Sequence, residues 1–237
     1  KELPTFLEVT RSVSKNYPFW IVFSAIIILI STYLMFNNNL IYFTKYALGL
    51  HEYQGLILGI LNGATLLAVP FWAYAALKIG KKNTWLLAMI ALLIGFSIFY
   101  YYPISDLNTL LYILVFIGFG NGATGVLFWS MLPDTIEYGE WKPGIRTESS
   151  LYGFMTFAQK GAIGIAVFIL GIALTGIGFE PNQEQSEETL KALKNLMSII
   201  PLIGVCISFA LLYFYPIDKN FHEKLIQDIE NRRALDV

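Results

Sequence analysis

The stretch that decides the fold is "GFMTFAQKGAIGIAVFILG", residues 153–171, which contains a single charged residue, Lys160. A helix needs roughly 20 apolar residues to cross the hydrocarbon core of a bilayer. This run and the apolar residues beside it meet that length. The lysine inside it needs a reason, because a charge at the centre of a bilayer costs at least about 2.5 kcal/mol.

The rest of the chain repeats this pattern. It has 237 residues, of which 56% are hydrophobic and 14% charged, and a mean hydropathy of +0.58. Soluble domains carry about 25% charged residues, and a soluble helical bundle needs polar faces at helical period, which these segments nearly lack. We therefore predict an all-α integral membrane protein with six transmembrane helices, at Phe19–Tyr46, Gln54–Leu77, Thr84–Tyr102, Thr109–Leu132, Leu151–Phe179 and Asn195–Tyr215.

Composition also argues against several classes of function. The net charge of −1 gives no electrostatic case for binding nucleic acid. One cysteine and two histidines make a disulfide impossible within the chain and a transition-metal site improbable. A membrane enzyme would show convergent titratable groups, whereas Lys160 has no histidine or acid beside it in the sequence. We expect no enzyme, no cofactor, no nucleic-acid partner and no metal site in this chain.

The charge distribution predicts the organisation and the orientation. Residues 1–17 are a polar segment, 18–215 the six-helix bundle and 216–237 a tail whose apolar residues recur at helical spacing. We expect the tail to form a helix resting on the protein or on the membrane surface. With the amino terminus in the cytoplasm, twelve Lys and Arg residues lie inside and three outside, which favours cytoplasmic ends. Since residue 1 is Lys, we expect the chain to begin within a longer protein.

Two polar interruptions stand inside the spans. Burying three adjacent amides, Asn37, Asn38 and Asn39, without partners would cost several kcal/mol, so we predict a wet cavity on at least one side of them. The alternative is an interface near the outer surface. The stretch "GFGNGATG", residues 118–125, includes Asn121 and four glycines, which weaken a helix. This pattern is typical of a transport pathway or of a tight helix crossing, and both remain open.

Lys160 lies 12 residues after Glu148, the acid at the predicted cytoplasmic edge of its span. That separation is about 18 Å along a helix, close to the membrane midplane and too far for the side chain to reach water. Thr156 and Gly164 lie one turn before and after it, and Gln159 adjoins it, which makes a narrow polar stripe. No acid in this sequence is placed to pair with Lys160, so we expect its counter-charge to come from protein outside this sequence.

The stretch "DTIEYGEWKPGIRTESSLYGF", residues 134–154, follows the fourth span and alternates acids with bases. It is either a solvated connection or a latch of ion pairs that closes the inner face. Exposed ion pairs contribute about 0–1 kcal/mol each, which suits a gate that opens repeatedly.

These residues carry a family resemblance. "PDTIEYGEWKPGIRTES" (133–149) followed by "FAQKG" (157–161) resembles the pattern of the glycoside–pentoside–hexuronide:cation symporters, the group of the melibiose carrier within the major facilitator superfamily. The stretches "YFTKYALG" (42–49), "LKIGKKNTW" (77–85) and "EPNQEQSEETLKALK" (180–194) agree. The resemblance implies that these are the last six helices, the C-terminal half, of a twelve-helix transporter with a central cavity and alternating access.

The resemblance also implies roles for individual residues. Lys160 would lie close to the cation and sugar sites, with Thr156 and Gln159 facing the cavity. The cation-binding acids would belong to the N-terminal six-helix half, which becomes the expected partner. The inner gate and conformational switch would comprise Asp134, Glu137, Tyr138, Gly139, Glu140, Arg146 and Glu148.

The leading hypothesis is a plasma-membrane secondary transporter that carries a sugar or glycoside with Na⁺ or H⁺. Amides hydrogen-bond hydroxyl groups and aromatic rings stack on sugar rings, so the candidate contacts are Asn37, Asn38, Asn39, Asn121, Trp129, Thr156 and Gln159. One alternative keeps the mechanism with a lysolipid or another amphiphilic substrate. Another is a membrane fragment that does not transport.

Overall fold

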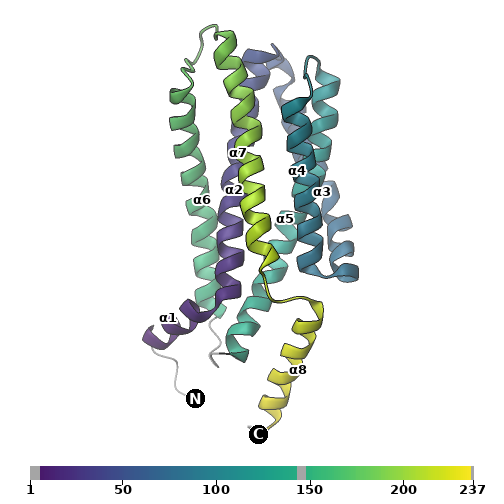
Figure 1. Cartoon of the computed structure of the whole chain (residues 1–237), viewed down its shortest axis with the longest axis vertical. Coiled ribbons are helices and arrows are strands. Elements are labelled where there is room, and N and C mark those ends of the chain that lie inside the picture. Colours follow the sequence, from purple (N-terminus) through teal and green to yellow (C-terminus); the bar gives the residue numbers. More distant parts are fainter. Residues whose placement is uncertain (1–5, 143–147, 236–237) are drawn as a thin grey trace.

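The structure, a computed structural model, describes residues 6–142 and 148–235 and contains helices and no strands within those ranges. Six helices are long and apolar enough to cross a bilayer (Figure 1): α2 (Tyr17–Tyr42, continued by the π-helix Phe43–Ala47), α3 (Gln54–Ile79, preceded by the 3₁₀ turn His51–Tyr53), α4 (Lys81–Tyr101), α5 (Leu107–Trp141), α6 (Glu148–Gly176) and α7 (Glu187–Tyr213). The six predicted spans are confirmed.

Two further helices lie at one end of the bundle. These are α1 (Phe6–Lys15) and α8 (Lys219–Leu235), and both described ends of the chain lie there with them (Figure 1). The turn between α3 and α4 and the end of α5 face the same way. The two chain ends therefore lie on one side of the bundle, as an even number of spans requires.

Two helices extend furthest past their predicted ends, by eight or nine residues. Helix α5 continues through Pro133 to Trp141, whereas the prediction ended it at Leu132. Helix α7 begins at Glu187 rather than Asn195, because the Ser186 side chain accepts a hydrogen bond from the Thr189 backbone and two glutamates occupy the first turn. The length of an apolar run predicts only the part of a helix that lies in hydrocarbon, whereas the hydrogen-bonded helix can continue into water.

Helices α2 and α5 are central. Helices α3 and α4 pack on α5, α6 and α7 pack on α2, and α4 and α7 contact each other. Helix α2 begins at the Asn16 cap, whose side chain accepts a hydrogen bond from Phe19 N, with Pro18 in the first turn. Phe36 of α2 then meets Phe96 and Phe99 of α4 edge to face, at ring-centroid distances of 5.1 and 5.5 Å.

Of the two alternatives for the glycines of "GFGNGATG", the structure shows the tight helix crossing. A Cβ at Gly118 would lie 2.5 Å from the Leu61 carbonyl oxygen, and one at Gly122 would lie 2.6 Å from the Thr65 carbonyl oxygen. These two glycines therefore allow α5 to cross α3 closely. A Cβ added at Gly125 would meet no atom of another described segment within 4 Å, and Gly125 lines a cavity.

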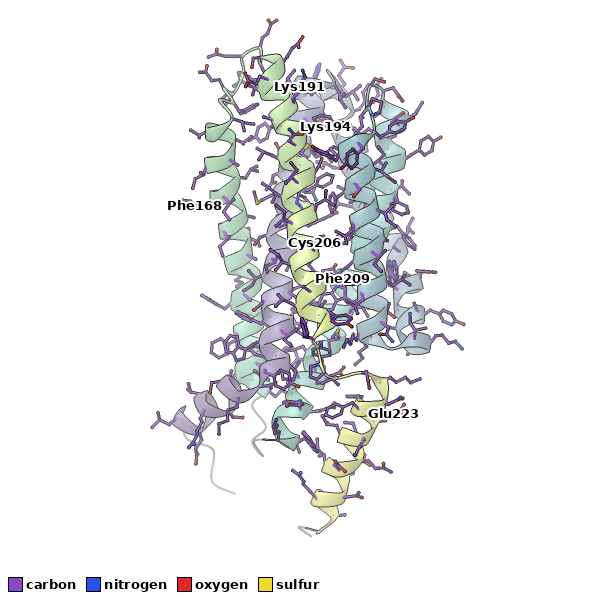
Figure 2. The ribbon with its side chains drawn as sticks, viewed as in Figure 1. Phe168, Lys191, Lys194, Cys206, Phe209 and Glu223 are labelled. Carbon is purple, nitrogen blue, oxygen red and sulfur yellow. The ribbon has the colours of Figure 1, made fainter. Side chains whose placement is uncertain are left out.

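Helices α3 and α6 are the least covered. Each buries 22% of its most apolar segment, against 50% for α5. Phe157 and Phe168 of α6 are 73% and 69% exposed, and Phe168 points outward from the bundle (Figure 2). Apolar faces of this extent need lipid or another protein surface against them.

The glycine packing gives a stability prediction. Gly118→Ala should destabilise the bundle by about 1–3 kcal/mol, because the added methyl group meets backbone that cannot move aside easily. Gly59→Ala on α3 is the matched control, since its Cβ meets open space. The thermal unfolding midpoints of both variants in detergent test this, and equal midpoints would contradict the close α3–α5 crossing.

Candidate functional site

A cavity of about 260 Å³ lies between α2, α3, α5 and α6. It brings together three of the predicted sugar contacts, Asn121 and Trp129 of α5 and Gln159 of α6. The remaining lining residues are mostly apolar: Ile26, Leu29, Ile30, Tyr33, Leu34, Thr65, Val69, Gly122, Thr124, Gly125 and Phe128. An apolar wall with a few convergent polar groups is the usual construction of a small-molecule site.

Trp129 stands at this cavity as part of an aromatic pair. Its ring is nearly parallel to that of Tyr152 of α6, at an interplanar angle of 17° and a centroid distance of 6.4 Å. The Trp129 side chain is 44% exposed, so part of its surface is open to a ligand. Phe128, the preceding residue of α5, contacts the same indole at a ring-centroid distance of 4.7 Å.

Lys160 and Thr156 are exposed on α6, one turn apart. The Thr156 hydroxyl donates a hydrogen bond to the Tyr152 carbonyl oxygen at 2.9 Å. Within the described residues, the Lys160 ammonium makes no hydrogen bond or ion pair. Gln159 lines the cavity, and Lys160, about 100° around the helix, does not.

The three adjacent asparagines divide between two environments. Asn37 and Asn38 are half-buried and lie one turn beyond Tyr33 and Leu34, which line the cavity, so they share that side of α2. The structure places Asn39 away from the cavity, and its contact with a sugar stays a prediction. Asn39 is 1% exposed and donates a hydrogen bond to the Leu193 carbonyl oxygen of α7, because it lies on the opposite side of α2.

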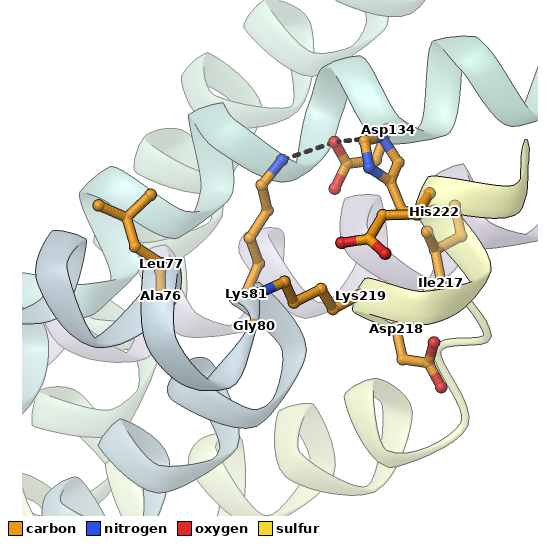
Figure 3. A pocket seen from close by; sticks show the side chains of 10 residues that line it. Ala76, Leu77, Gly80, Lys81, Asp134, Ile217, Asp218, Lys219 and His222 are labelled. Atoms are coloured by element: carbon orange, nitrogen blue, oxygen red, sulfur yellow. Dashed lines mark hydrogen bonds and ion pairs between the residues drawn. The ribbon is translucent and has the colours of Figure 1, made fainter. Parts of the chain in front are cut away.

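A second cluster lies where α4, α5 and α8 meet, beside a cavity of about 210 Å³ (Figure 3). Asp134 is 4% exposed, and its Oδ1 atom lies 2.6 Å from Lys81 Nζ. His222 Nε2 lies 2.7 Å from Glu137 Oε2 and 3.4 Å from Asp134 Oδ1. Asp134 and Glu137 of the predicted gate thus meet two residues that the sequence did not single out. We name these four residues the inner cluster.

The sequence signals for the two missed residues were weak. Lys81 stood in "KIGKKN", which indicated only a turn, and His222 stood in the polar tail. Lys81 also donates a hydrogen bond to the Ser130 carbonyl oxygen at 2.8 Å, which ties the start of α4 to α5. Positive residues after a span predict orientation but not the acid that they pair with.

Helix α8 is held against the extension of α5. Leu225 and Ile229 are 1% and 6% exposed, and Phe221 packs edge to face on Trp141 at 5.8 Å. The Trp141 indole also donates a hydrogen bond to Asp228 at 3.1 Å. The tail was expected to rest on the protein or on the membrane surface, and the structure shows it packed on the protein.

Two other predicted gate residues, Tyr138 and Gly139, follow Glu137 on α5. Tyr138 is 2% exposed and meets Tyr17 edge to face at 5.5 Å, while Gly139 is buried in α5. Glu140 and Glu148 lie at either side of segment 143–147, and Arg146 lies outside the described residues. Of the predicted gate residues, all except Arg146 thus lie in the described part of the chain.

The electrostatics of the inner cluster favour a charged His222. Its hydrogen bond with Glu137 raises the pKa of the imidazole, and the nearby Asp134 and Glu137 charges raise it further, against opposition from partial burial and from Lys81. Asp134, Glu137 and His222 place possible metal-ligand atoms within 4.8 Å of one another. Because the Lys81 ammonium already faces Asp134, the arrangement is that of a charge-compensated network.

Comparison with known proteins identifies the family of the chain. A family model described as "MFS/sugar transport protein" matches residues 1–219. The chain is 30% identical over 95% of its length to the glucuronide carrier protein homolog of Escherichia coli K12, and 32% identical over 82% to the isoprimeverose transporter of Lactiplantibacillus pentosus. It is 31% identical over 81% to a putative sulfoquinovose importer of E. coli K12. The matches cover 50%, 40% and 41% of these relatives, so the chain spans about half the length of such proteins.

The His222 contacts give a pH prediction. Since the pKa of His222 is raised in the folded state, its contribution to stability should be fully present below the unfolded pKa, about 6.5, and lost as pH rises through the folded value. The thermal midpoint of the wild type should therefore exceed that of His222→Gln by more at pH 6 than at pH 8.5. A difference that stays constant with pH would refute a charged His222 in the inner cluster.

Proposed function

Because the chain belongs to the MFS/sugar transport protein family, we propose that it forms one six-helix half of a transporter that carries a sugar or glycoside across the plasma membrane by alternating access. The observation that carries this proposal is the cavity between α2, α3, α5 and α6, where amides and an aromatic ring converge inside a multi-pass membrane bundle. The other half, the N-terminal six helices, would cover the exposed faces of α3 and α6.

The cargo is a sugar rather than a lysolipid. The relatives are named for a glucuronide, for isoprimeverose and for sulfoquinovose, and none of the three is named for a lipid. The cavity supports the same choice, since Asn121 and Gln159 offer both donors and acceptors to hydroxyl groups and Trp129 offers a ring surface. Trp129, Asn121 and Gln159 are the proposed contacts on this half, with Asn37 and Asn38 further along α2.

Lys160 would couple the sugar to a cation. Its ammonium lacks an anionic partner in the described chain, so a carboxylate from the other half would pair with it across the cavity. A Na⁺ or H⁺ bound to that carboxylate neutralises it and weakens its attraction for Lys160. Cation occupancy would thereby change the force that holds α6 against the other half, which is how binding biases one conformation.

The inner cluster would close the cytoplasmic side. The pair between Lys81 and Asp134 joins α4 to α5, and the pair between His222 and Glu137 joins α5 to α8. These contacts tie three elements at one end of the bundle into a unit. In the proposed cycle this unit moves as a whole against the other half, together with the predicted gate residues that flank it.

The orientation has a direct test. In a full-length transporter lacking Cys206, single cysteines at residues 183–190 should react with a membrane-impermeant maleimide added outside intact cells, and cysteines at 78–82 should react only after permeabilisation. This follows from the excess of Lys and Arg on the proposed cytoplasmic side. The reverse pattern would place both described ends of the chain outside.

The transport function has its own test. Proteoliposomes containing the full-length protein should accumulate at least one of isoprimeverose, methyl β-D-glucuronide and sulfoquinovose when a Na⁺ or H⁺ gradient is imposed, and should not move radiolabelled lysophosphatidylcholine. In the same assay, Lys160→Val should lower gradient-driven uptake to the level of empty liposomes, because the charge that senses the cation site is gone. Lys191 is an exposed lysine at the start of α7, so the control variant Lys191→Val should transport normally. Normal gradient dependence in Lys160→Val would remove Lys160 from coupling.

A further inference from the structure

A buried hydroxyl group without a partner stands in the wall of the sugar cavity. In the described chain, five side chains bury a polar atom that makes no hydrogen bond: Ser12, Tyr33, Asn39, Trp85 and Tyr215. Of these five, Tyr33 is the one that lines the cavity. Leaving a buried donor unpaired is unfavourable, so a group retained in this state is a candidate for pairing with a ligand.

Two further polar groups face the same point from other helices. Thr65 of α3 and Asn121 of α5 line the cavity and lie close to the Tyr33 hydroxyl of α2, but neither contact has the geometry of a formed hydrogen bond. The three polar groups therefore stand close together in the cavity wall without a formed hydrogen bond between Tyr33 and the other two.

The three groups complement one another chemically. The Thr65 hydroxyl donates its hydrogen bond to the Leu61 carbonyl oxygen at 2.9 Å, so toward the cavity its oxygen can only accept one. The Tyr33 hydroxyl has a free proton to donate, and the Asn121 amide offers a donor and an acceptor. An alcohol hydroxyl, which donates one hydrogen bond and accepts two, satisfies such a set.

The surroundings select an uncharged ligand group. The residues that line the cavity include no Asp, Glu, Lys, Arg or His, and the neighbours of Tyr33 on α2 are Leu29, Ile30 and Leu34. A carboxylate or sulfonate placed here would meet no compensating charge in the described chain. An uncharged hydroxyl on the edge of a sugar ring suits both the three polar side chains and the apolar residues around them.

We propose that Tyr33, Thr65 and Asn121 form a subsite that binds one hydroxyl group of the transported sugar, with Tyr33 as its main specificity-determining residue. This inference rests on the proposed sugar transport and goes beyond it, because it assigns Tyr33 and Thr65 to recognition at a single sugar position. A site built to hydrogen-bond a hydroxyl group rejects the deoxy analogue, since the protein groups are then left unpaired, whereas an apolar pocket discriminates weakly.

The test is a cycle of protein and sugar changes in the full-length transporter. Isoprimeverose, methyl β-D-glucuronide or sulfoquinovose, whichever the wild type transports, is compared with its monodeoxy analogues by calorimetric binding. Tyr33→Phe should raise Kd for the parent sugar about tenfold, as expected for one hydrogen bond lost in a buried site. One deoxy analogue should bind the wild type about tenfold more weakly than the parent sugar and should bind Tyr33→Phe with no further loss.

The controls separate recognition from folding. Tyr215→Phe removes another buried unpaired hydroxyl, outside the cavity, and should leave Kd unchanged. Thr65→Val, which keeps the side-chain shape, should lose discrimination at the same sugar position as Tyr33→Phe. Thermal midpoints of all three variants should stay near that of the wild type.

Each outcome decides the inference. Three results would overturn the subsite while leaving sugar transport intact. Tyr33→Phe could weaken the binding of every analogue equally, or leave the Kd for the parent sugar unchanged. Thr65→Val could lose discrimination at a different sugar position from Tyr33→Phe. Transport of none of the three sugars by the wild type would overturn the proposed function, and the subsite with it.

Discussion

Hydrocarbon offers no hydrogen bonds and no hydration, and this constraint shapes the whole chain. Its backbone is helical through all but the last one to three residues of the predicted spans, and its charged residues lie outside these spans or at their ends, with Lys160 as the exception. An ammonium that finds no partner in the described residues needs water or an anion near it. The face of α6 that carries Lys160 therefore belongs against a wet cavity or another protein bundle, whereas Phe168 on the same helix points outward and suits lipid.

Helix α5 connects the two ends of the proposed mechanism. One uninterrupted helix of 35 residues carries Asn121 and Trp129 at the cavity and Asp134 and Glu137 in the inner cluster. From Asn121 to Asp134 the helix rises about 20 Å. Close contact of Gly118 and Gly122 with α3 ties the same helix to its neighbour. A displacement at the cavity would therefore reach the proposed cytoplasmic end through packed, hydrogen-bonded structure, which is a physical route for coupling between sites.

The sequence predicted the features that follow from keeping polar groups out of hydrocarbon. Six spans follow from apolar length, and Asn121, Trp129 and Gln159 could be proposed because polar and aromatic residues within such spans require a reason. The sequence could not tell which side of α2 each asparagine faces, since Asn39 turns toward α7 through a contact between segments far apart in the chain. The pairing of His222 with Glu137 has the same origin. Tyr33 gave no signal at all, because a tyrosine is ordinary in an apolar helix until its hydroxyl is seen to lack a partner.

In the proposed transporter, this half would keep the recognition of charge apart from the recognition of hydroxyl groups. The cavity holds Gln159 and no ionic side chain among its lining residues, while Lys160, the next residue, projects elsewhere from α6. Two adjacent residues on one helix cannot move independently. In the proposed mechanism, a tilt or rotation of α6 that brings Lys160 toward its carboxylate also moves Gln159 relative to Asn121 and Trp129. Helix α6 packs mainly on α2 and is among the least buried helices, so it breaks fewer contacts by moving than α5 would. Cation and sugar would then act on each other through the position of a single helix, with no direct contact between them.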